Sequence, residues 1–78
     1  MNLIEMYQKA FVEAFEIEPQ EAENFVYKET EKWDSIGHMM LIAALEEAFS
    51  IEFEPEEMLE LDSYGKGIEL LRKKGIAL

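Results

Sequence analysis

The chain has 78 residues but no cysteine, two prolines, four glycines and a single histidine. Without cysteine, neither a disulfide nor a thiolate metal site can stabilise the fold, so a small apolar core must suffice. Positive charge is also scarce, because seven lysines and arginines stand against eighteen aspartates and glutamates, for a net charge of −11. So acidic a chain repels phosphate backbones and anionic lipids, which argues against nucleic-acid binding and favours basic protein partners.

Long hydrophobic segments are missing as well. The longest unbroken apolar run, residues 39–45, is far shorter than the roughly 20 residues that span a bilayer as a helix. The first fifteen residues include Glu5 and Glu13 and lack the basic start and continuous apolar stretch of a signal peptide. We therefore expect a cytoplasmic protein without membrane insertion. Hydrophobic residues still make up 49% of the chain, which is enough for one folded domain over residues 1–78.

Apolar residues at helical spacing predict four helices, with a broad apolar stripe on the longer ones. Prolines help to set the helix ends, since Pro19 ends the first helix and Pro55 suits the first position of the third. An alternating run at residues 50–54 has no second strand to pair with, so we interpret it as a connector. The expected helices cover residues 3–16, 35–49, 55–60 and 63–74.

Residues 17–33 follow neither a helical nor a strand period, although Phe25, Tyr27 and Trp33 are too apolar for free solvent. We predict a long packed loop there, with one short helical turn near residues 20–25 as the alternative. Loops of this length are uncommon in compact domains and are often functional. The predicted architecture is therefore all-α, a four-helix bundle with a long first loop and a short third helix.

A serine stands directly before the longest helix, at the end of the long loop. Asp34 and Ser35 both suit the N-cap position, so the pair could serve only to start the helix. Neither completes a capping box, because Gly37 and His38 occupy the positions where glutamate or glutamine is expected. A phosphodiester on Ser35 would meet the free N–H groups and the positive end of the helix dipole, which stabilise an anion. The pair is compatible with a plain cap and with an attachment site.

The sequence around this pair resembles the acyl carrier proteins and their peptidyl and aminoacyl relatives, which hold 4′-phosphopantetheine on the serine of an Asp-Ser-Leu motif. Here the motif reads Asp34-Ser35-Ile36, and the resemblance continues through residues 44–49, 51–53 and 56–57 to the final helix. It implies a bundle of the acyl carrier protein type. It also implies that a separate phosphopantetheinyl transferase with Mg²⁺ moves the group from coenzyme A to Ser35, so the chain is a substrate and not an enzyme.

On this resemblance, the thiol of the arm would carry an acyl or aminoacyl group as a thioester between biosynthetic enzymes of a fatty acid, polyketide or specialised acyl pathway. A loading ligase or transferase and downstream synthases with basic surfaces would be its partners, and a monomer is expected. The partner surface would include Ile36, Gly37, His38, Met40 and Glu47. The acyl cavity would include Leu45, Phe53, Leu61 and Gly67.

His38, the only histidine, lies three residues after Ser35 and so on the same face of the helix. A Ser35–His38 nucleophile pair would also need a third residue to orient the histidine and an oxyanion hole, for which 78 residues leave little room. We expect instead a partly exposed His38 that partner enzymes touch. The chain has no cluster with metal-ligand spacing, so no metal site is predicted.

Gly37, His38 and Met40 carry no negative charge, whereas fatty-acid carrier proteins usually have acidic residues in these turns. Met39 and the aliphatic residues after it fill the inward arc of the helix, so Met40 is expected to face solvent. A dedicated pathway is therefore expected in place of the usual fatty-acid enzymes. The alternative from another class is an acidic interaction module that binds a basic protein, carries no prosthetic group and uses Ser35 only as a cap.

Overall fold

The computed structural model describes residues 2–25, 27 and 33–78. In this part of the chain the regular structure consists of four α-helices and one 3₁₀ helix, without a β-strand. The predicted all-α bundle is confirmed, and each predicted α-helix ends within one residue of its expected position. The elements are α1 (Leu3–Phe15), η1 (Pro19–Asn24), α2 (Ser35–Phe49), α3 (Pro55–Glu60) and α4 (Tyr64–Lys73).

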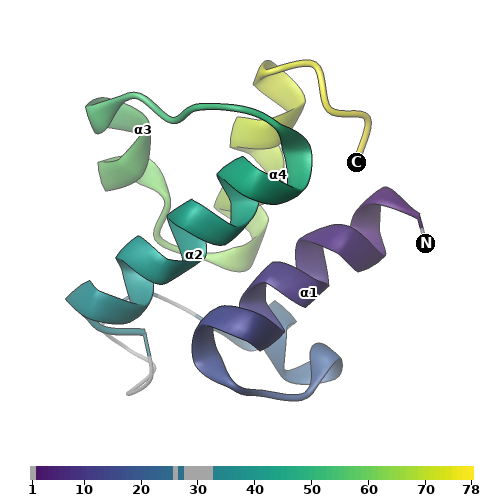
Figure 1. Ribbon diagram of the computed structural model, residues 1–78, viewed down its shortest axis with the longest axis vertical. Coiled ribbons are helices and arrows are strands. Elements are labelled where there is room, and N and C mark those ends of the chain that lie inside the picture. The colour runs from purple at the N-terminus through teal and green to yellow at the C-terminus, as the bar shows by residue number, and fades with distance from the viewer. Residues whose placement is uncertain (1, 26, 28–32) are drawn as a thin grey trace.

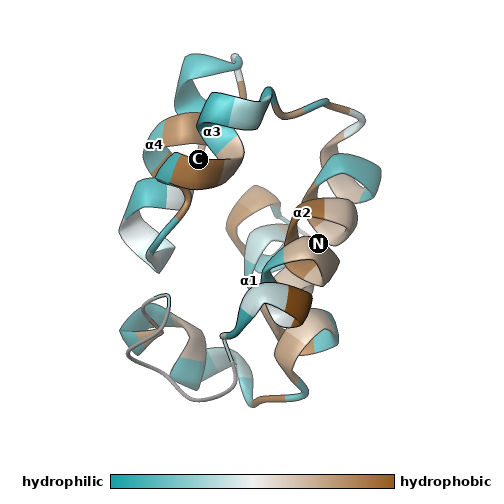
Figure 2. Ribbon diagram, turned by 90° about the vertical axis from the view of Figure 1, so that its left-hand side faces the viewer, coloured by the Kyte–Doolittle hydropathy of each residue, from teal (hydrophilic) through white to brown (hydrophobic). Residues whose placement is uncertain are grey.

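The short helical turn considered for the first loop is present as η1, which packs against both α1 and α4. Residues 26 and 28–32 of that predicted loop lie outside the described residues. α1 and α2 lie side by side (Figure 1). Figure 2 shows α3 and α4 on one side of the molecule and α1 and α2 on the other. None of the helices described is both long and apolar enough to cross a membrane.

Local signals in the sequence explain where the helices begin and end. Asp34 and Ser63 cap α2 and α4, because their side-chain oxygens accept hydrogen bonds from the N–H groups of Gly37 at 2.8 Å and Lys66 at 3.1 Å. At their other ends, α1 and α2 finish in a left-handed residue that is not glycine, Glu16 with φ 55° and Ser50 with φ 54°. Each left-handed residue turns its own N–H back to a carbonyl of the last helical turn.

A cluster of aromatic rings fills the core between α1, α4 and the end of the first loop. Phe11 lies at its centre, with the Tyr7 ring centroid 5.2 Å away and the Trp33 ring meeting it edge-on at 5.6 Å. The Tyr7 hydroxyl donates a hydrogen bond to the carbonyl of Tyr64, and burial raises the pKa of the Tyr7 phenol well above its ordinary value. Ring packing and one buried hydrogen bond thus join α1 to α4.

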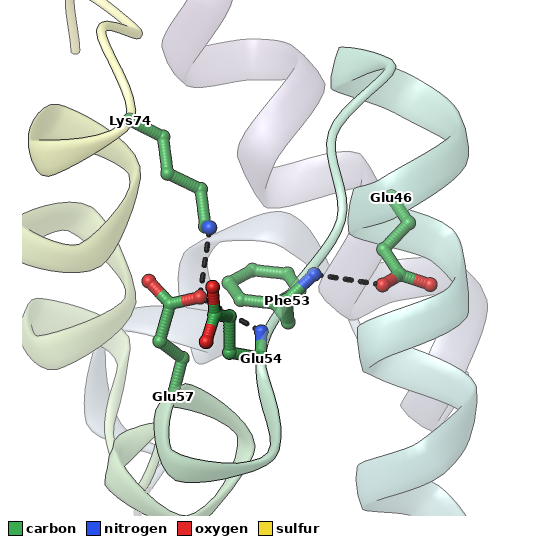
Figure 3. A network of polar contacts seen from close by, with 5 residues as sticks. All are labelled: Glu46, Phe53, Glu54, Glu57 and Lys74. Atoms are coloured by element: carbon green, nitrogen blue, oxygen red, sulfur yellow. Dashed lines mark hydrogen bonds and ion pairs between the residues drawn. The ribbon is translucent and has the colours of Figure 1, made fainter.

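α3 is attached differently, because none of its residues is buried. The N–H of Glu54 donates to Glu57 Oε1 at 2.8 Å, and Lys74 Nζ pairs with the same oxygen at 2.8 Å (Figure 3). In the connector before α3, the Phe53 N–H donates to Glu46 Oε2 at 2.9 Å, while Lys74 Nζ lies 5.4 Å from the Phe53 ring centroid. Polar contacts therefore link α3 and its connector to α2 and to the end of α4.

Candidate functional site

Ser35 occupies the first position of α2 and its side chain is exposed. The helix is capped by the Asp34 carboxylate, so the Ser35 hydroxyl is not needed for that purpose. Its Oγ lies 3.4 Å from the Tyr27 hydroxyl, a long separation for a hydrogen bond between two hydroxyls. The structure thus places the Ser35 hydroxyl at the surface, where a second molecule can reach it.

One turn further along α2, the His38 ring is enclosed. Trp33 Nε1–H donates a hydrogen bond to His38 Nδ1 at 3.0 Å, and His38 Nε2 lies 2.7 Å from the carbonyl oxygen of Met58 in α3. The Tyr27 ring meets the imidazole edge-on at 4.8 Å, and the Trp33 ring stacks on it at 6.0 Å. His38 therefore connects the end of the first loop, α2 and α3 at one point. The hydrogen bond with Met58 is a further attachment of α3.

The prediction of a partly exposed His38 is wrong, since only 9% of the residue is accessible to solvent. Gly37 is buried too, so neither Gly37 nor His38 is presented to a partner. The physical reason is that His38 lies on the inward stripe of α2, three and four residues before the buried Leu41 and Ile42. Ile36 and Glu47, by contrast, are exposed, as partner contacts must be.

Both ring nitrogens of His38 face groups other than Ser35. A serine activated by a neighbouring histidine needs a ring nitrogen within hydrogen-bond reach of its Oγ. Here Nδ1 accepts from Trp33 and Nε2 faces the Met58 carbonyl, so His38 is not placed as a base for Ser35. Among the described residues there is also no group of three or more histidine, aspartate or glutamate side chains that could hold a metal ion.

A cleft of about 530 Å³ opens between α2 and α3, and it lies beside Ser35 because Tyr27, whose hydroxyl is 3.4 Å from Ser35 Oγ, lines it. Its wall is mainly apolar, and the polar groups of Tyr27, His38 and Asp62 also face it. The sequence did not indicate this cleft, because its residues come from the first loop, α2, α3 and the connector before α4. They are Tyr27, His38, Met39, Pro55, Met58, Leu59 and Asp62.

Large apolar side chains stand exposed around the cleft and the start of α2. Met40 is 51% exposed, as predicted, but Met39 is 56% exposed, so its predicted place in the inward arc is wrong. His38 takes that inward position instead. The most exposed of these side chains are Ile36 at 74% and Leu59 of α3 at 86%. An apolar surface therefore borders Ser35 within an acidic chain.

The residues predicted to form an acyl cavity lie in the packed core. Leu45, Phe53, Leu61 and Gly67 are all buried, and they line a different part of the molecule from the cleft beside Ser35. The space next to Gly67 is filled by the Tyr7 hydroxyl and by Leu61. Glu47, at the other end of α2, borders a smaller groove of about 320 Å³ between α1 and α2.

Comparison of the chain with protein-family models, with curated proteins and with solved structures gives no match. The features of the chain that indicate a function lie around Ser35: an exposed serine at a helix start, a carboxylate that caps the helix in its place, and an apolar cleft alongside.

Proposed function

We propose that this chain is a carrier protein that holds an acyl or aminoacyl group as a thioester on 4′-phosphopantetheine attached to Ser35. It would work as a monomer in the cytoplasm and deliver its cargo between biosynthetic enzymes. The observation that carries this function is the exposed Ser35 hydroxyl at the start of α2, which the helix does not need as a cap. The Asp34-Ser35-Ile36 motif and the order of long, short and final helices after it support the same function.

The residues present fit the phosphopantetheine group. The first N–H groups of an α-helix have no partner within the helix, and a phosphodiester on Ser35 Oγ would lie beside those of α2. Asp34 already binds the Gly37 N–H, so the groups nearer to Ser35 are the ones left for the phosphate. When bound, the group supplies the thiol that this cysteine-free chain lacks. The cleft between α2 and α3 offers an apolar surface next to that attachment point.

The surface near Ser35 also indicates the kind of partner. Ile36 and Met40 would contact an apolar patch of a loading ligase or a synthase, while Glu47 would face basic residues near the other end of α2. Charges at the rim of an interface mainly set the association rate and exclude wrong partners. A phosphopantetheinyl transferase would have to reach Ser35 across the same surface.

Modification in vitro tests this function directly. The purified chain is incubated with coenzyme A, Mg²⁺ and a broad-specificity phosphopantetheinyl transferase, and its intact mass is measured. We expect a gain of one phosphopantetheinyl group in the wild type and none in Ser35→Ala. Ser63→Ala is the matched control, because Ser63 also follows an aspartate but uses its hydroxyl to cap α4.

The control variant should keep the mass gain. An unmodified wild type would contradict the carrier function and leave the acidic interaction module, in which Ser35 only starts the helix. Modification that survives in Ser35→Ala and is lost in Ser63→Ala would show that the wrong serine was chosen.

A further inference from the structure

The two hydrogen bonds of His38 define its protonation state. The indole N–H of Trp33 can only donate, so His38 Nδ1, 3.0 Å away, must offer a lone pair. The carbonyl of Met58 can only accept, so His38 Nε2, at 2.7 Å, must carry the proton. Both bonds are made only by a neutral ring with its hydrogen on Nε2. They join the end of the first loop, α2 and α3.

A second proton on the ring would break this arrangement. It would have to sit on Nδ1, where its N–H would oppose the N–H of Trp33, and a buried donor without an acceptor is costly. A small shift of the indole cannot relieve this conflict, because Trp33 is itself buried against the Phe11 and Phe15 rings of α1. Protonation of His38 therefore favours a state in which Trp33 leaves this packed position and separates from His38.

Among the residues that the structure describes, the charged groups around the ring do not offset this conflict. From α2 itself, the nearest acid along the chain is Asp34, whose carboxylate is engaged with the Gly37 N–H. From the connector before α4, Asp62 borders the same cleft but is exposed to solvent, which screens its charge. The first loop contributes the Tyr27 phenol, and α3 contributes only the Met58 carbonyl as a hydrogen-bonding partner in the described structure.

We propose that His38 is a pH-dependent positioning residue for the cleft beside Ser35. In its neutral form it holds the Trp33 end of the first loop and α3 against α2. Its protonation releases Trp33, while Nε2–H still donates to the Met58 carbonyl and keeps α3 attached. This role of His38 does not depend on a prosthetic group at Ser35, so it can be tested on the unmodified chain.

The chain supplies its own probes, since it has one tryptophan and one histidine. We would label the unmodified protein with ¹⁵N and follow the Trp33 indole N–H and the two His38 ring nitrogens by NMR from about pH 8 to about pH 5. At the upper end the ring should be the neutral Nε2–H form. On acidification the indole signal should shift with the same single midpoint as the ring. Exchange of the amides from Met58 to Leu61 should stay unchanged, because Nε2–H still donates to the Met58 carbonyl.

Two neutral substitutions separate the two bonds. The side-chain oxygen of His38→Asn lies near the former Nδ1 and can still accept from Trp33, while the amide nitrogen of His38→Gln lies near the former Nε2 and can still donate to Met58. Neither titrates, so both variants should lose the pH response of the indole signal, and His38→Asn should keep its hydrogen-bonded position. The wild-type ring spectrum does not depend on whether the variants fold.

An Nδ1–H ring at high pH, or an indole signal that ignores the ring's titration, would overturn the proposal. So would the same pH response in folded His38→Asn as in the wild type.

Discussion

α3 and α4 follow each other in the chain, yet the structure holds them in different ways. α4 buries four residues, Tyr64, Gly67, Leu70 and Leu71, against the rest of the core, whereas α3 buries none. α3 is held instead by the ion pair of Glu57 with Lys74 (Figure 3) and by the contact of Met58 with His38. Close packing is insensitive to pH and salt, while charged and titratable contacts respond to both. The responsive helix is the one that borders the cleft beside Ser35.

The largest effect is expected from Gly67→Ala in α4, the closely packed helix. A Cβ at this position would overlap the Tyr7 hydroxyl, which is held by its hydrogen bond to Tyr64, and would lie 2.9 Å from Leu61 Cδ1. Overpacking of this kind costs about 1–3 kcal/mol, measured as a lower free energy of unfolding in urea.

Gly65→Ala is the matched control, because a Cβ there would have no neighbour within 4 Å. It should be neutral or stabilise the fold by about 0.5 kcal/mol through the lost flexibility of the unfolded chain. Equal effects of the two substitutions would show that α4 is not closely packed against α1.

A smaller effect is expected from Lys74→Met, which changes the polar contacts that hold α3. This change removes the ion pair with Glu57 and the contact with the Phe53 ring. The side chains of Lys74 and Glu57 are both only partly exposed. We expect a loss of about 0.5–1 kcal/mol at low salt and a smaller loss in concentrated salt. Lys9→Met provides the comparison, because Lys9 pairs with Glu13 at 4.0 Å, with both side chains more than half exposed, and should contribute almost nothing. A salt-independent loss for Lys74→Met would assign its effect to packing.

The smallest expected effect is the loss, at low pH, of the contribution that Glu57 makes to the free energy of unfolding. The Glu54 N–H, and after it the Lys74 ammonium, lower the pKa of the Glu57 carboxyl below its ordinary value of 4.5. The unfolded chain then binds this proton more readily than the folded chain, so the contribution of Glu57 is complete above about pH 4.5 and is lost as the pH falls below it. Glu57→Gln should flatten the dependence of unfolding free energy on pH in that range. An unchanged slope would mean that Glu57 does not stabilise α3.

The helix ends were predictable because each depends on a short stretch of sequence. Pro55 at a first position, and Asp34 and Ser63 at caps, act through backbone groups within three residues of themselves. The placement of Ser35 at the start of α2 followed from the same signals. Local chemistry was enough to locate the candidate attachment site.

The surroundings of Ser35 were harder to predict. The burial of His38 had a signal in the sequence, since positions 38, 41, 42 and 45 form one helical stripe, but the predicted inward arc includes Met39 and not His38. The partner of His38 in α3 is a backbone carbonyl, which every residue has, so no residue type at position 58 could reveal it. The cleft combines side chains from four segments, and their meeting depends on tertiary packing that periodicity does not describe.

The left-handed residues that end α1 and α2 have a consequence for how this chain can change. A left-handed backbone costs an ordinary residue about 1 kcal/mol that glycine avoids, and here glutamate and serine occupy the two positions. Glu16→Gly and Ser50→Gly should each recover part of that cost, without touching the surface around Ser35. The fold can therefore be stabilised by substitutions at sites remote from the cleft. Such substitutions could offset destabilising changes that adapt the Ser35 surface to a new partner.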